Sequence, residues 1–283
     1  MILSPVLFAQ PPVLDQARVA SQALSFAEQL PNLIGTEKLQ QKSISYATRM
    51  HIRAGEAALR PIEPKVWRRE ITSEIGYALR GKDVPVWYEL RKVIDVDGKA
   101  VTAPKKARER LAFGLKTDDE RSRFKLLEEF MSYGLDGLAT DYGLSLLLFR
   151  SGEINKFQFQ YQGSEFVGAE RISIYSFRRA DGEVAVTIFD GEQASRQPLT
   201  GLIWLQDSNL RPVRVKLVTL LRQNGSEIID DGTVDYAPSK FGCVLPEKIE
   251  YKRMIDGKLM IETQYTYSGF QKYAAEAELK FNE

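Results

Sequence analysis

Hydrophobic and polar residues alternate with a period of two through most of the C-terminal half of the chain. The alternating runs lie at residues 157–162, 172–175, 184–188, 213–217, 249–252 and 259–267. This alternation predicts antiparallel strands that have one buried face and one solvated face.

Dipeptides that tolerate positive φ separate these runs. They are Asp181-Gly182, Asp190-Gly191, Asn224-Gly225, Asp231-Gly232 and Asp256-Gly257. Asp256-Gly257 is the strongest hairpin signal, because it stands between two alternating runs. Strands joined by short turns pair with their sequence neighbours, so this half predicts an antiparallel meander.

The N-terminal part mixes a helix with strands. Residues 13–30 have apolar side chains at helical spacing, with Asp15 as the N-terminal cap and Pro31 as the stop. The polar segment 37–53 is ambiguous, and its alternation suggests a strand. Residues 67–79 and 86–96 alternate as two strands of a hairpin, and Asp97-Gly98 then turns the chain.

A helix is predicted to begin at Thr117, because Thr117 and Glu120 form a capping box. Its expected buried stripe consists of Phe124, Leu127, Phe130 and Met131. Gly134 is expected to end this helix in a left-handed conformation.

A second short helix is predicted from Thr140 or Asp141. Because Leu146 and Phe149 make this segment apolar nearly all round, we expect it to be deeply buried inside a curved sheet.

Composition excludes several classes of function. The chain has 283 residues, a net charge of +1, one cysteine (Cys243) and one histidine (His51). These counts leave no basic field for nucleic acid, no intramolecular disulfide and no Cys/His metal cluster. No apolar run approaches the roughly 18 residues of a membrane span, and Cys243 is expected to be a small buried side chain in a strand.

The first ten residues, MILSPVLFAQ, resemble the end of a secretory signal peptide. The alternative is an apolar tail that packs on the domain. We therefore expect a signal-peptide remnant at 1–10 and one domain at 11–283, in which 11–116 is an N-terminal extension and 117–283 holds helices and the antiparallel sheet.

The candidate motifs for ligand binding or catalysis are incomplete. Residues 76–83 fit a phosphate-binding loop except that Asp83 stands where Ser or Thr would hold magnesium. Residues 95–98 resemble only the start of a calcium loop. The basic segment 103–110 could bind phosphate or anionic lipid, but a solvated linker or helix face explains it better. No spacing points to a pair of catalytic carboxylates.

Three segments resemble motifs of LolA/LolB-like lipoprotein-carrier proteins. Residues 201–215 are similar to their Trp-containing hairpin, 244–249 to a strand that begins with a Leu-Pro pair, and 265–270 to their last strand, with Gly269 in place of asparagine. The whole chain also resembles uncharacterised secreted proteins of acidobacterial type. The resemblance implies an α+β fold, a half-barrel of antiparallel strands wrapped around a few helices, with an apolar cavity. Carriers of this type bind acyl chains, and the related RseB/MucB-type sensors bind lipoprotein or lipopolysaccharide signals.

We therefore expect a non-enzymatic periplasmic or secreted protein that binds a lipid, a lipoprotein or another hydrophobic ligand, without a cofactor or metal. An envelope protein-interaction or sensor module without a lipid ligand is the alternative, and a hydrolase with distant acidic residues is a third. The expected ligand contacts lie on the apolar sheet face and the inner helix. They are Leu144, Leu147, Leu148, Phe157, Phe159, Tyr161, Trp204, Val215, Leu217, Tyr251, Tyr265 and Tyr267.

Overall fold

The computed structural model describes most of the chain. The described residues are 12–46, 63–80, 86–117, 119–135, 141–179, 186–190, 193–197 and 199–273. Several positions discussed above lie outside these ranges. They are residues 1–10, His51, the dipeptide Asp181-Gly182, and Gly191 of the expected Asp190-Gly191 turn.

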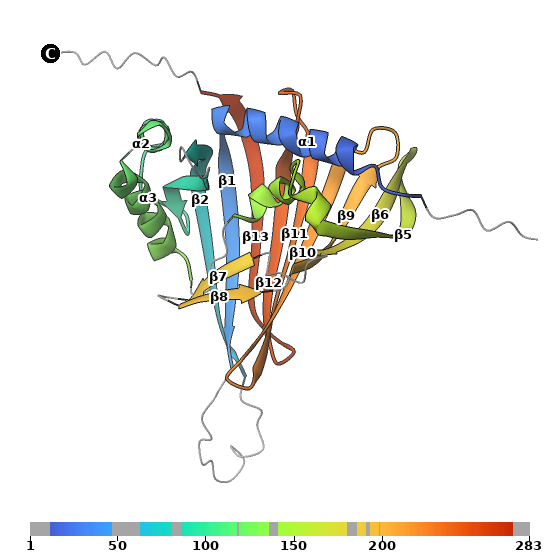
Figure 1. The fold of residues 1–283 in the computed structure, drawn as a ribbon. Coiled ribbons are helices and arrows are strands. Elements are labelled where there is room, and N and C mark those ends of the chain that lie inside the picture. Colours follow the sequence, from blue (N-terminus) through green and yellow to red (C-terminus); the bar gives the residue numbers. More distant parts are fainter. Residues whose placement is uncertain are drawn as a thin grey trace, which may run out of the picture.

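Eleven strands form one antiparallel sheet in the order β4-β3-β2-β1-β13-β12-β11-β10-β9-β6-β5 (Figure 1). The strands are β1 Leu33–Ser45, β2 Lys65–Arg80, β3 Val86–Val96, β4 Lys99–Ala100, β5 Phe157–Val167, β6 Glu170–Arg179, β9 Leu199–Gln206, β10 Pro212–Gln223, β11 Ser226–Pro238, β12 Val244–Ile255 and β13 Lys258–Lys272. A separate pair consists of β7 Val186–Asp190 and β8 Gln193–Gln197. Since β1 pairs with both β2 and β13, the first and last strands of the chain meet in one sheet.

Helices cover both faces of this sheet. They are α1 Gln16–Gln29, α2 Pro104–Lys116 and α3 Glu120–Tyr133, together with the 3₁₀ helices η1 Leu30–Asn32, η3 Tyr142–Phe149 and η4 Ile154–Lys156. Helix α1 crosses the strands and lies with η3 on one face, here called the inner face, whereas α2 and α3 stand at the β2–β3 end (Figure 1). The fold class is therefore the expected one, an α+β protein with a large curved antiparallel sheet around helices.

Two separate cores follow from this arrangement. The main core lies on the inner face, where Phe26 of α1 and Phe149 of η3 are fully buried with strand residues such as Ile203 and Val234. The smaller core lies between α2, α3 and the opposite face of β2 and β3, and includes Leu115. Strand β3 is covered by the main core on one face and by the smaller core on the other, so some of its polar side chains are buried.

Local signals for helix ends and turns are largely confirmed. The Asp15 carboxylate accepts a hydrogen bond from the Arg18 N–H and caps α1. The turns at Asp97-Gly98, Asn224-Gly225 and Asp256-Gly257 all have positive φ at both residues. Cys243 is buried, as expected, but it lies in the bend before β12 and not in a strand. These features were predictable because a cap or a turn depends on only a few consecutive residues.

The turn expected at Asp231-Gly232 is wrong. Both residues lie inside β11, where Gly232 pairs with Leu217 of β10 and Tyr251 of β12. A Cβ atom on Gly232 would stand 2.0 Å from the ring of Tyr142 in η3. The glycine is thus a place where a ring approaches the backbone of a strand, and not a turn residue.

The expected start and end of α3 are also wrong, and of its expected buried stripe only Phe130 is buried. Asp119 caps α3 through the Arg121 N–H, and Thr117 is the C-cap of α2. The buried residues are Arg123, Leu126 and Phe130, whereas Phe124 is 58% exposed and Leu127 and Met131 are also exposed. Gly134 has an ordinary φ of −71°. The charged Arg123 takes an inward position because its Nη1 donates to the Thr117 carbonyl at 2.8 Å and its guanidinium lies over the ring of Tyr88.

The short apolar segment after Asp141 is helical and buried, as predicted, but it is 3₁₀ in geometry. Leu146 and Phe149 of η3 are fully buried against the sheet. Residues 104–110 belong to α2, where Arg108 bonds to the buried carboxylate of Glu74 at 2.8 and 3.2 Å.

Candidate functional site

The inner face of the curved sheet holds most of the predicted ligand-contacting residues. Those within the main core are Leu147, Phe157, Val215, Tyr265 and Tyr267, and those packed against it are Leu144, Leu148, Phe159, Tyr161 and Leu217. Tyr251 is also buried, beside the ring of Tyr142. The residues of η3 and the sheet therefore pack against one another and fill this face, and their contact with a ligand stays a prediction.

An aromatic cluster closes the β5–β6 end of the inner face. The ring of Phe149 in η3 lies 5.0–6.1 Å from the rings of Phe157, Phe159 and Phe177. Phe157 and Phe177 are buried, but Phe159 is only half-buried, because β5 is the last strand of the sheet. The apolar interior is therefore nearest to solvent along β5.

Trp204 is the one predicted contact that lies elsewhere. Ile203 and Leu205 belong to the main core, so Trp204 between them points to the outer face of β9. There its ring contacts the guanidinium of Arg214 at 5.6 Å, and Arg214 also pairs with Asp235.

Tyr251 has a structural partner that sequence reasoning missed. Its hydroxyl donates to the buried carboxylate of Asp230 at 2.6 Å, and Arg253 bonds to both oxygens of Asp230 at 2.7 and 2.9 Å. Burial raises the pKa of Tyr251 and of Tyr142 well above their usual value, so both stay protonated.

A cluster of buried charges lies on the inner face at the β1–β3 end. Arg91 of β3 donates to both carboxylate oxygens of Glu37 of β1, at 2.7 Å each. Its Nη2 also lies 3.3 Å from Oε1 of Glu89. All three side chains are at most 2% exposed. Phe130 of α3 packs its ring 4.8 Å from the guanidinium, so the cluster is sealed from water on that side.

The cluster contains two carboxyl groups and one arginine, and the pKa of one carboxyl, Glu89, is raised. Burial raises the pKa of Glu89 to about 7, assisted by the charges of Asp141 and Glu37, while Arg91 opposes the rise. Glu89 Oε2 accepts a hydrogen bond of 2.7 Å from the backbone N–H of Asp141, which precedes η3. The carboxyl thus connects the charge cluster to the start of η3.

Tyrosine hydroxyls surround this cluster. Burial raises the pKa of Tyr77, Tyr265 and Tyr267 well above its usual value, and the charges of Glu37 and Glu89 add to the shift. Within the described part of the chain, the hydroxyls of Tyr77 and Tyr267 have no hydrogen-bond partner. Such groups are costly to bury, which marks this region as more polar than the rest of the core.

The sequence held only a weak signal for this cluster. In β3, Glu89 and Arg91 alternate with Tyr88 and Leu90, and an isolated strand with that pattern would put the charged pair in water. Both sides are buried because α2 and α3 cover one face and the main core covers the other. The ion pair between Glu37 of β1 and Arg91 of β3, which reaches across β2, could not be inferred from residue spacing.

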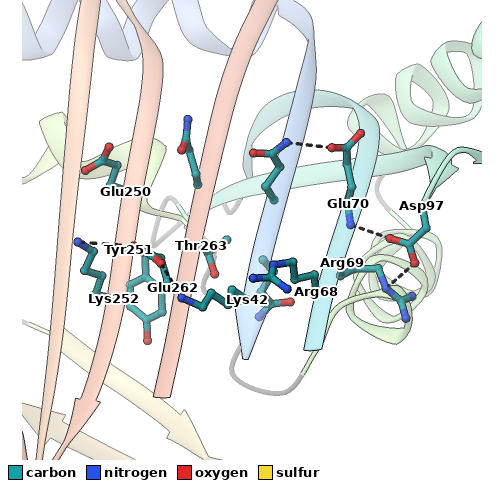
Figure 2. A pocket seen from close by; sticks show the side chains of 13 residues that line it. Lys42, Arg68, Arg69, Glu70, Asp97, Glu250, Tyr251, Lys252, Glu262 and Thr263 are labelled. Carbon is teal, nitrogen blue, oxygen red and sulfur yellow. Dashed lines mark hydrogen bonds and ion pairs between the residues drawn. The ribbon is translucent and has the colours of Figure 1, made fainter. Parts of the chain in front are cut away.

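A polar depression lies on the outer face of β2, β1, β13 and β12 (Figure 2). It has a volume of about 490 Å³, and charged side chains pair within it. Lys42 and Lys252 approach Glu262 at 3.7 and 3.6 Å, and Gln40 bonds to Glu70 at 2.9 Å. Mutual pairing leaves this surface little net charge with which to hold a ligand.

Two features are absent from the described residues. They contain no group of three or more His, Cys, Asp and Glu side chains placed to hold a metal ion. None of their helices has the length and apolarity required to cross a bilayer.

Two solved structures align with most of this chain at low sequence identity. A LolA superfamily protein from Nitrosomonas europaea is 12% identical with a TM-score of 0.33, and the match covers 90% of this chain and 94% of that one. A DUF1329 family protein from Desulfovibrio piger is 12% identical with a TM-score of 0.37, and the match covers 94% of this chain and 96% of that one. No protein family and no curated protein matches the sequence.

Proposed function

We propose that this protein is a non-enzymatic binding protein for a lipid, a lipoprotein or another hydrophobic ligand, and that the ligand's acyl chain occupies the inner face of the sheet. The observation that supports this most is η3, an apolar segment of eight residues that lies in the curve of the sheet. The ligand would take the place of side chains such as Leu147 and Phe149.

The local geometry of η3 favours such displacement. Runs of 3₁₀ helix longer than three or four residues are uncommon, because their hydrogen bonds are poorly aligned. Asp141, which precedes η3, has a φ of 66°, an unusual value for a residue with a side chain. Each methylene of an acyl chain that replaced η3 would contribute about 0.8 kcal/mol by burial.

The acidic residues of the interior do not support hydrolysis. Both oxygens of Glu37 are bonded to Arg91, and that guanidinium also reaches Glu89. A substrate and a water could not stand between these carboxyls, as glycoside hydrolysis requires. We therefore favour binding over catalysis. The motif resemblance to lipoprotein carriers also supports a location in the periplasm or outside the cell.

The test is to identify what the protein carries. Protein purified from its own source would be examined by native mass spectrometry and by lipid extraction, and delipidated protein would be titrated with a fluorescent long-chain fatty acid. We expect a bound lipid mass and saturable binding with one chain per protein.

Two variants of β5 sharpen this test. Phe159→Ala removes a half-buried ring from the inner face and should weaken fatty-acid binding about tenfold, which is about 1.4 kcal/mol. Phe166→Ala removes a 71% exposed ring from the same strand and should leave binding unchanged. Absence of both copurified lipid and saturable binding would refute the proposal and favour the protein-interaction alternative.

A further inference from the structure

We propose that strand β5 pairs with β5 of a second copy of this chain, so that two sheets join into one across a two-fold axis. β5 is the last strand of the sheet, and among the described strands only β6 pairs with it (Figure 1). One side of its backbone therefore has no partner strand in the described part of the chain. Such an edge is a template on which another strand can pair. This interaction goes beyond the proposed ligand binding and does not depend on it.

The composition of β5 leaves its edge unprotected. Proteins usually protect an exposed edge by making the strand short or by placing charges or proline on it. β5 is 11 residues long, and residues 157–164 (FQFQYQGS) contain no charged residue and no proline. The register with β6 shifts only between Tyr161 and Gly163. Residues 157–161 thus form a regular, uncharged edge that is suited to pairing.

The opposite edge of the sheet is protected in the usual ways. Strand β4 has only two residues there, Lys99 and Ala100, and one of them is charged. The neighbouring strand β3 is packed against α3, whose Glu129 pairs with Lys92. The two edges therefore differ, and β5 is the one that can accept a further strand.

The β5 segment is chemically the same when it is read in reverse. Residues 157–161 give aromatic, Gln, aromatic, Gln, aromatic in both directions. In an antiparallel pair centred on Phe159, each ring faces a ring of the second copy, and Gln158 faces Gln160 of the second copy. Aromatic pairs and glutamine pairs are favourable across strands, and like charges do not meet in this register. This self-complementarity favours a second copy over an unrelated strand.

Pairing would also cover apolar surface that β5 leaves open. Phe159 and Tyr161 on the inner face are only half-buried, whereas Phe177 of the next strand, β6, is buried. In the joined sheet, rings of the second copy would lie beside both half-buried rings. The second copy would therefore complete the wall of the inner face at this end, and the removal of apolar surface from water favours association.

The state of association in solution is the first test. A contact between two strands is smaller than the roughly 1,600 Å² of a standard interface, so we expect a reversible dimer. Sedimentation velocity of the full chain, from about 1 µM to about 200 µM, should show a shift from one chain to two as the concentration rises. A chain that stays monomeric throughout this range would overturn the proposal.

Two lysine substitutions at opposite edges locate the contact. Gln160 is exposed, and in the pair it would approach Arg178 of the second copy, because Arg178 bonds to Gln158 at 3.2 Å. Gln160→Lys should therefore weaken the dimer at least tenfold without changing the melting temperature of the monomer. Ala100→Lys adds the same charge to an exposed position of β4 and should leave the dimer unchanged. Equal effects of the two variants, or none from Gln160→Lys, would refute pairing through β5.

Disulfide cross-linking tests the register. Cys243 is the only cysteine of the chain, so the variants are made in a Cys243→Ala background. An equimolar mixture of Gln158→Cys and Gln160→Cys chains should form a linked dimer on mild oxidation, because residues directly opposite each other in antiparallel strands lie close enough. A mixture of Gln160→Cys and Lys99→Cys chains should not. A dimer that fails to cross-link in the first mixture, or cross-links equally in both, would place the contact elsewhere.

Discussion

Arg91 on β3 lies 2.7 Å from both carboxylate oxygens of Glu37 on β1, although β2 separates the two strands. The pair reaches over Ser73 and Ile75 of β2, which are the register partners of Glu37 and Arg91. A bidentate pair of this kind ties three strands together on the inner face.

Removing the arginine should leave two buried carboxyls without a counterion. We expect Arg91→Leu to lower the free energy of unfolding by about 3–5 kcal/mol, measured by urea denaturation. Lys38→Leu breaks the exposed pair between Lys38 and Glu70 and should cost about 1 kcal/mol or less. If the two variants lose similar free energies of unfolding, Arg91 does not stabilise the buried carboxyls.

Stability should depend on the protonation of Glu89. Its pKa is raised from 4.5 to about 7 in the folded protein, so the folded state holds a proton that the unfolded state has released. The favourable contribution is complete below pH 4.5 and is lost as the pH rises to about 7. The melting temperature of Glu89→Gln, relative to wild type, should therefore rise between pH 5 and pH 8.

Glu70→Gln is the control for this titration. The pKa of Glu70 is lowered, by hydrogen bonds from Gln40 and Lys38, so its contribution has the opposite sign. Its melting temperature relative to wild type should stay flat between pH 5 and pH 8, because Glu70 is ionised throughout. A flat difference for Glu89→Gln as well would show that Glu89 does not titrate in this range.

Gly232→Ala should disturb the packing of η3 against β11. The new Cβ would stand 2.0 Å from Cε1 of Tyr142, so the ring must leave β11. We expect a loss of about 1–3 kcal/mol in the free energy of unfolding. In a Tyr142→Ala background the same substitution should cost much less, and equal costs in both backgrounds would exclude this contact as the cause.

Phe149 should be the most sensitive residue of η3. It is fully buried and contacts the rings of Phe157, Phe159 and Phe177. Phe149→Ala should cost about 3–5 kcal/mol in thermal or urea unfolding. Phe113→Ala on α2 removes a ring that is 60% exposed and should change stability by about 0.5 kcal/mol or less. Equal effects would contradict the assignment of η3 to the core.

Helix α3 illustrates why part of the fold escaped prediction. Residues 117–120 satisfy the capping-box pattern, yet the chain caps α3 with Asp119 and ends α2 at Thr117. Spacing alone could not choose between Arg123 and Phe124 as the inward residue. The choice depends on the Thr117 carbonyl and the Tyr88 ring, which Arg123 contacts in the folded chain.

The sequence by itself determined most of the strands (but not β11), the turns at residues 97–98, 224–225 and 256–257, and the burial of η3. These features follow from periodicity and turn chemistry, which act over a few neighbouring residues. Only the tertiary structure decided that Gly232 lies within a strand, that Trp204 faces outward, and that Glu37, Glu89 and Arg91 share one buried cluster. The physical reason is that burial and charge compensation depend on partners from distant strands, which no local pattern specifies.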